Sequence, residues 1–179
     1  YSAAQISLSA VLPTFEHMGA QVIDERPYRA APVGGGEAWI YDFGLRGAAE
    51  NLERVRDLFQ EAFSGAQRGE YEDDGLGGLV LRAALSGREI VILRAVARYL
   101  RQARIAYSDA YMERTLNSHP DIARLMVKLF AARFDPDAPD AELGEGLGRA
   151  MDLAIDGVPS LDEDRILRSF LSVVCACLR

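Results

Sequence analysis

The chain has 179 residues, 49% of them hydrophobic, which is enough for one domain, or one domain with a small second unit, around a buried core. Its 27 Asp and Glu residues outnumber its 20 Lys and Arg residues and give a net charge of −7. Such a chain gains nothing from the counterion release that drives nucleic-acid binding, so neither nucleic acid nor an anionic membrane is an expected partner. No run of about twenty apolar residues and no signal peptide is visible. The only cysteines, Cys175 and Cys177, are not expected to bridge each other, which fits a reducing cytoplasm, so we expect a cytoplasmic protein.

The first section of the chain is expected to mix helix and strand. Ser9 should cap a short helix that ends at Gly19, where a left-handed residue is favoured. Residues 21–28 and 38–43 are rich in β-branched and aromatic side chains and predict two strands. The proline and glycines of residues 32–36 predict the longish loop of a hairpin, which could border a ligand or simply turn the chain.

From residue 47 onward the pattern is helical throughout. Apolar residues recur at intervals of three and four, and Ser, Asp, Gly and Pro residues mark the boundaries. Loops are expected at the acidic residues 70–74 and at residues 135–140. No internal repeat is visible, which argues against a solenoid. The expected helices span residues 48–66, 76–85, 87–104, 108–117, 118–134, 143–155 and 160–179.

Two capping boxes are predicted at the starts of these helices. Ser86 with Glu89, and Ser160 with Glu163, have the spacing at which each side chain satisfies a free backbone N–H of the other residue. The whole pattern predicts an α+β fold that is predominantly α. We expect a small α/β portion at residues 1–66 and a helical domain, built as a bundle, at residues 67–179.

No constellation of catalytic, cofactor-binding or metal-binding residues is expected. The glycines at 75–78 and 144–148 match only the start of a dinucleotide fingerprint, and we interpret them as helix ends or close helix packing. His17 and His119 lie far apart in the sequence, and each is expected at a helix terminus rather than in a metal site. The two cysteines stand two residues apart on the last expected helix, so they cannot bridge each other.

A stripe of arginines is the feature most suggestive of an interaction surface. Intervals of four, three and three residues would place these arginines on one side of a single helix. Two interpretations stay open: a solvated face, or a docking face for an acidic neighbouring domain or subunit. The acidic pairs of the chain, Asp73 with Asp74 among them, are expected to be exposed. The stripe consists of Arg94, Arg98, Arg101 and Arg104.

Five stretches of the chain resemble the large bacterial NAD-specific glutamate dehydrogenases, in the order found in that family. They lie at residues 8–19, 22–28, 39–45, 93–136 and 160–168 and together cover most of the chain. The resemblance implies a fragment of the family's non-catalytic N-terminal region. Residues 1–66 resemble an ACT-like module without its first strand, and the rest resembles a helical segment that leads toward the dehydrogenase core.

The resemblance further implies a parent enzyme that oxidises L-glutamate to 2-oxoglutarate and ammonia while reducing NAD, and that is a homo-oligomer at full length. The family's catalytic lysine and nucleotide-binding glycines have no counterpart in this sequence, so the fragment itself is expected to be non-catalytic and to bind no NAD. A regulatory or architectural segment is the leading hypothesis, with other domains of the same chain as its partners. ACT modules elsewhere often bind amino acids, so an amino-acid effector is implied by analogy.

Two further hypotheses come from the residues. The chain could be an independent helical interaction module, an adaptor that docks acidic partners through the arginine stripe. A small DNA-binding domain would rest on the short break between helices at residues 117–120. The acidic net charge and the lack of a basic recognition helix at that break argue against DNA binding.

Overall fold

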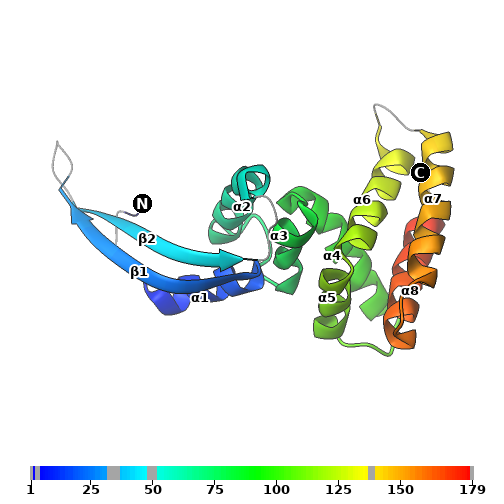
Figure 1. Cartoon of the computed structure of the whole chain (residues 1–179), viewed down its shortest axis with the longest axis horizontal. Coiled ribbons are helices and arrows are strands. Elements are labelled where there is room, and N and C mark those ends of the chain that lie inside the picture. Colours follow the sequence, from blue (N-terminus) through cyan, green and yellow to red (C-terminus); the bar gives the residue numbers. More distant parts are fainter. Residues whose placement is uncertain (1, 3–4, 32–36, 48–51, 137–139, 178–179) are drawn as a thin grey trace.

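The structure, a computed structural model, describes residues 2, 5–31, 37–47, 52–136 and 140–177. A β-hairpin with two helices beside it forms one end of the molecule, and a set of helices forms the other (Figure 1). The fold is α+β and predominantly helical, which confirms the predicted class. The elements in chain order are α1 (Leu8–His17), β1 (Ala20–Ala30), β2 (Ala38–Gly47), α2 (Leu52–Gln67), the 3-10 helix η1 (Gly75–Gly78), α3 (Leu79–Ala83), α4 (Gly87–Gln102), α5 (Asp109–Ser118), α6 (Pro120–Phe134), α7 (Ala141–Asp156) and α8 (Leu161–Ala176).

The hairpin consists of β1 and β2 paired in antiparallel orientation, as predicted, with both strands longer than expected. Gly19 lets the chain turn from α1 into β1 because it adopts a φ of +76°, which a residue with a Cβ disfavours. A bulge between Val22 and Asp24 leaves Ile23 without a partner in the register. The predicted loop at residues 32–36 lies outside the described residues.

A small apolar core lies between the hairpin and its helices. Phe15 of α1 is its centre, with ring centroids 4.7 Å from Phe63, 5.0 Å from Phe43 and 6.3 Å from Phe59. Aromatic rings at these separations attract one another in addition to the free energy gained by burying their surface. The buried members of this core are Val11, Phe15, Ala20, Val55 and Leu81.

A larger apolar core joins the helices from α3 to α8. It extends back to Met18 and Ala62, so the hairpin unit contributes side chains to it. The short helix α3 belongs to both cores, because Leu81 faces the hairpin core while Leu79 and Val80 are fully buried in the helical one. The largest completely buried side chains of the helical core include Phe170, Leu79, Leu93, Leu116, Met126, Met151, Ile155 and Ile166.

Two predicted helix caps are wrong. Helix α1 has Ser7 at its N-cap position, and Ser9 lies inside the helix, with its hydroxyl 2.7 Å from that of Ser7. Ser118 closes α5 instead of opening α6. The break comes one residue later because Pro120 disfavours the helical conformation in the residue before it, and His119 accordingly has a φ of −123°.

The two predicted capping boxes differ in outcome. At α4 both halves are present, since Ser86 accepts from the Glu89 N–H and Glu89 accepts from the Ser86 N–H. At α8 only the first half forms, in which the Ser160 hydroxyl accepts from the Glu163 N–H. The Glu163 carboxylate lies 3.0 Å from His119 Nε2, so it connects α8 to the junction of α5 and α6.

Candidate functional site

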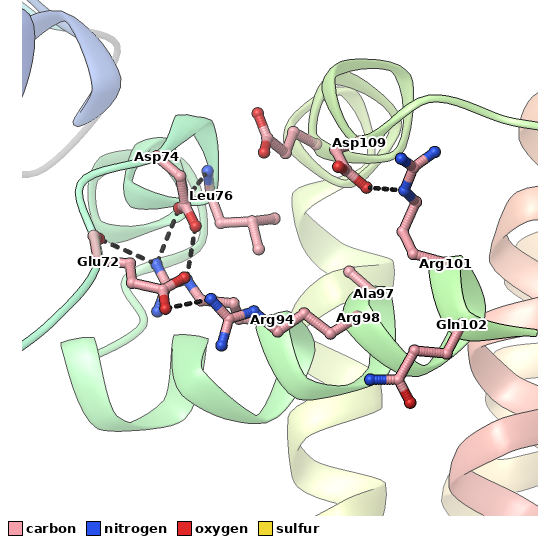
Figure 2. A pocket seen from close by; sticks show the side chains of 10 residues that line it. Glu72, Asp74, Leu76, Arg94, Ala97, Arg98, Arg101, Gln102 and Asp109 are labelled. Carbon is pink, nitrogen blue, oxygen red and sulfur yellow. Dashed lines mark hydrogen bonds and ion pairs between the residues drawn. The ribbon is translucent and has the colours of Figure 1, made fainter.

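A charged pocket of about 540 Å³ lies where α4, α5 and the acidic loop before η1 meet (Figure 2). Leu76 and Ala97 supply apolar surface to it. Three arginines and four carboxylates line it, so the pocket is not the positive patch that the arginine spacing alone suggested. Its charged lining consists of Arg94, Arg98, Arg101, Glu72, Asp74, Asp109 and Glu113.

Arg94 is the buried member of the predicted stripe and is only 8% exposed. Its guanidinium binds both carboxylate oxygens of Asp74, with Nε 2.5 Å from Oδ2 and Nη2 2.8 Å from Oδ1, and Nη2 also donates to the Glu72 carbonyl (Figure 2). Burial by itself would lower the pKa of Arg94, but the hydrogen bonds and negative charges of Asp74 and Glu72 outweigh it and raise the pKa. The stripe therefore begins with an internal structural ion pair.

The other arginines of the stripe are placed differently from one another. Arg98 pairs with Glu72, and Arg101 Nε lies 3.0 Å from Asp109 Oδ1. Both guanidinium groups remain largely exposed on the outside of α4. The expectation that all four share one helix is wrong for Arg104, because α4 ends at Gln102 and Arg104 has a left-handed φ of 62°.

Asp73 and Asp74 belong to the same loop, but their side chains bind different helices. While Asp74 holds Arg94 of α4, Asp73 accepts from the Thr14 hydroxyl at 2.7 Å and lies 2.8 Å from His17 Nδ1. Thr14 and His17 belong to α1, so the loop binds the hairpin unit on one side and the helical unit on the other. The sequence presented this loop only as an exposed acidic segment. No local sequence signal shows that this loop folds back onto the arginine stripe, so the pairs could be found only in the structure.

Glu113 of α5 has a pKa above the usual range for a glutamate. Partial burial is the largest cause, and the negative charges of Asp74 and Asp109 add to it, while a hydrogen bond from the Gly75 N–H acts in the other direction. The folded protein therefore binds this proton more tightly than the unfolded chain does. The resulting stabilisation is present at low pH and is lost as the pH rises through the raised pKa.

We therefore expect Glu113→Gln to raise the melting temperature at about pH 8, with the gain shrinking toward zero as the pH falls to about 5. Glutamine cannot ionise and can still accept the Gly75 N–H. Thermal unfolding of both proteins across this pH range measures the effect. Glu145→Gln, at a side chain that is 78% exposed, is the control and should leave the curve unchanged. A gain of equal size at both ends of the range would contradict the assignment.

The remaining candidates from the sequence are the glycines at 75–78 and 144–148 and the two cysteines. Gly78 lies against Asn117, and a Cβ added to it would come within 2.5 Å of Asn117 Oδ1, which confirms close packing at residues 75–78. The same interpretation is wrong for Gly146 and Gly148, because both lie inside α7 and a Cβ added to either would meet no atom within 4 Å. Cys175 and Cys177 are free thiols near the end of α8. Among the described residues there is no group of three or more His, Cys, Asp or Glu side chains that could hold a metal ion.

No helix in the described part of the chain is both long and apolar enough to cross a lipid bilayer.

Two family models match separate parts of the chain. Residues 1–57 match the family model described as "Glutamate dehydrogenase, ACT3 domain", and residues 71–136 match "Glutamate dehydrogenase, helical motif 3". The first match covers α1, the hairpin and the start of α2, and the second covers the acidic loop and the helices from η1 to α6. The acidic loop begins the second match, and α7 and α8 lie beyond it.

Curated relatives agree with these matches along nearly the whole chain. The NAD-specific glutamate dehydrogenases of Halomonas elongata, Pseudomonas aeruginosa and Mycobacterium tuberculosis are 41%, 39% and 40% identical over 98%, 97% and 97% of this chain. The chain belongs to the NAD-specific glutamate dehydrogenase family. It spans about 11% of the length of each of these relatives.

Proposed function

We propose that this chain is a non-catalytic regulatory or architectural segment of an NAD-specific glutamate dehydrogenase. The full-length protein would oxidise L-glutamate to 2-oxoglutarate and ammonia with reduction of NAD, in the cytoplasm and as a homo-oligomer. The names and identities of the relatives support the reaction, and the two family models support the position of this segment. NAD would be a cofactor of the full-length enzyme and not of this segment.

The observation that carries the architectural part of the proposal is the acidic loop that binds both units. We divide the chain into domains at residues 1–66 and 67–179, joined by that loop and by α3. Asp73 bonds to α1 and Asp74 bonds to α4, so the loop contacts both of the proposed domains. Other domains of the parent chain would then attach to this support.

Thermal unfolding of the chain with the common amino acids, and with NAD for comparison, tests the proposal. A ligand that binds only the folded state raises the melting temperature by mass action. We expect NAD to leave the melting temperature unchanged. A rise with one or two amino acids would identify an effector and favour the regulatory form of the proposal, and no rise would favour the architectural form. A clear rise with NAD would contradict both forms.

The arginine stripe of Arg94, Arg98, Arg101 and Arg104 remains a candidate docking face within the parent protein, chiefly through its exposed members. Arg98 and Arg101 are 64% and 52% exposed and are the groups that an acidic neighbouring domain could reach. The alternative of an independent adaptor is not favoured, because the chain matches domains of an enzyme family along most of its length.

Charge reversal tests the docking face in the full-length protein. We expect Arg98→Glu with Arg101→Glu to weaken its assembly, because each new carboxylate would repel both the acidic partner and the neighbouring Glu72 or Asp109. The oligomeric state by light scattering is the measurement. Arg149→Glu with Arg165→Glu is the matched control, since these arginines are also exposed but lie on α7 and α8. Equal behaviour of the two double variants would count against the docking face.

A further inference from the structure

Helix α7 has an apolar face that the rest of the described chain leaves largely uncovered. The helix packs mainly against α6 and α8, at the end of the molecule away from the hairpin (Figure 1). On its outer side Leu143 is 52% exposed and Leu153 is 74% exposed. Gly146 and Ala150 lie between these leucines, and the intervals of three, four and three residues place all four on one side of the helix. We call these four residues the α7 face.

The glycine in this face has no explanation within the described chain. A glycine inside a helix destabilises it relative to alanine, because the glycine backbone is freer in the unfolded state. Gly146 does not have a left-handed φ, and a Cβ added to it would meet no described atom within 4 Å, so neither the backbone nor a neighbour requires glycine there. Two helices approach each other more closely where the side chains between them are small. Gly146 between two exposed leucines therefore fits a helix that packs against the α7 face from outside.

The charged border of the α7 face indicates the chemistry of its partner. Glu142, Glu145, Arg149 and Asp156 follow one another along one side of the face, so the border has a net negative charge. Arg149 lies 3.9 Å from Glu145, and Asp156 pairs with Arg168 of α8. Among the described residues Glu142 has no ion pair. Charge complementarity therefore favours a partner with basic side chains at this border.

We propose that the α7 face docks an amphipathic helix from another part of the full-length polypeptide. The apolar stripe of that helix packs on Leu143 and Leu153, and its Lys or Arg residues lie beside Glu142 and Glu145. This chain spans about 11% of the length of each relative, so the remaining polypeptide is long enough to supply such a helix. The proposal rests on the proposed architectural role, because the partner is another domain of the same protein.

A second copy of this chain fits the α7 face less well than a basic helix does. In an antiparallel pair related by a twofold axis, the two leucines of one copy would face those of the other, so the apolar residues would match. The same axis would place Arg149 against Arg149 of the second copy and Glu142 near Asp156 of the second copy. Like charges at these positions repel each other, so the charged border argues against this pair.

Cysteine labelling of the full-length protein tests the proposal. Leu153→Cys and Asp152→Cys place thiols at neighbouring positions of α7 that are both exposed in this chain but lie on different sides of the helix. We expect a maleimide to label position 152 at least about tenfold faster than position 153, because only position 153 is covered by the docked helix. Mass spectrometry of the peptides separates these thiols from Cys175 and Cys177. Equal rates would overturn the proposal, and so would a difference that disappears on dilution, which would indicate a second copy.

A pair of glycine variants tests the close approach at Gly146. Gly146→Gln and Gly148→Gln, each combined with Leu153→Cys, both replace a helical glycine with a better helix former at a site where a Cβ meets no described atom within 4 Å. The two positions lie on nearly opposite sides of α7. We expect Gly146→Gln to speed labelling at position 153 by about tenfold and Gly148→Gln to leave the rate unchanged. Equal rates in the two variants would contradict docking at the α7 face.

Charge reversal tests the basic side of the partner. Glu142→Lys with Glu145→Lys, again combined with Leu153→Cys, should speed labelling at position 153 by about tenfold, because like charges then face each other at the border. Glu53→Lys with Asp57→Lys is the matched control, since it makes the same change of charge at two exposed positions four residues apart on α2. An unchanged rate in the first variant would exclude a basic partner.

Turnover of L-glutamate with NAD by the same full-length protein tests the proposed function separately. Equal labelling at positions 152 and 153 in an active enzyme would overturn docking at the α7 face and leave the proposed function in place. Slow labelling at position 153 in a protein without this activity would support the docked helix and count against the proposed function.

Discussion

Arg94→Met is expected to lower the free energy of unfolding by about 3 kcal/mol, because it leaves the Asp74 carboxylate without its partner in a partly buried site. Arg94 is only 8% exposed, and both of its hydrogen bonds to Asp74 are short. Methionine retains much of the aliphatic side chain, so the loss reports mainly on the ion pair. Denaturant unfolding followed by circular dichroism measures the effect.

Two further variants separate the ion pair from other causes. Arg98→Met, one turn later on the same helix and at a guanidinium that is 64% exposed, should cost less than about 1 kcal/mol. Adding Asp74→Asn to Arg94→Met should restore part of the lost stability, because the amide carries no charge and can still accept the Leu76 N–H. If the double variant were no more stable than Arg94→Met alone, an unpaired carboxylate would not explain the loss.

Phe170→Ala is expected to destabilise the helical unit by about 3–5 kcal/mol through lost burial and a residual cavity. Phe170 is completely buried on α8, in the same core as Leu93 of α4 and Met126 of α6. Helix α8 lies outside residues 71–136, which match the helical motif. A loss of this size, with a single cooperative transition, would mean that α8 is part of the same folding unit as the matched residues.

Leu153→Ala provides the control for that experiment. It also shortens an apolar side chain on the C-terminal pair of helices, but Leu153 is 74% exposed, so the change should stay within about 0.5 kcal/mol. Unfolding monitored by both circular dichroism and tyrosine fluorescence shows whether one transition or two occur. A separate early transition in Phe170→Ala would show that α7 and α8 unfold independently of the remaining helices.

The existence and type of the elements could be predicted from the sequence because they depend on local patterns. Helical spacing of apolar residues and the Ser86 capping box identified α4, and the β-branched and aromatic runs identified the hairpin. The boundaries were less predictable. Ser118 is of a residue type that is common at N-caps, but α6 starts only at Pro120. Ser160 does cap α8, but the Glu163 carboxylate lies against His119 and does not complete the capping box.

The partners of the charged residues could not be predicted in the same way. The spacing of Arg94, Arg98 and Arg101 correctly placed them along one helix, but it could not show that an acidic loop about twenty residues earlier folds back onto that helix. Ion pairs between residues distant in sequence depend on tertiary packing, which carries no local signal. The stripe therefore looked more positive in the sequence than it is in the folded protein.

The short helix α3 also bears on which substitutions this part of the chain can accept. Of its five residues only Arg82 is exposed, while Leu79, Val80, Leu81 and Ala83 are buried. A larger or smaller side chain at Leu81 alters the fit to the hairpin, and one at Leu79 or Val80 alters the fit to the helices. Compensating changes would have to arise in two domains at once, so variation among homologues should concentrate at Arg82 and be least at its neighbours.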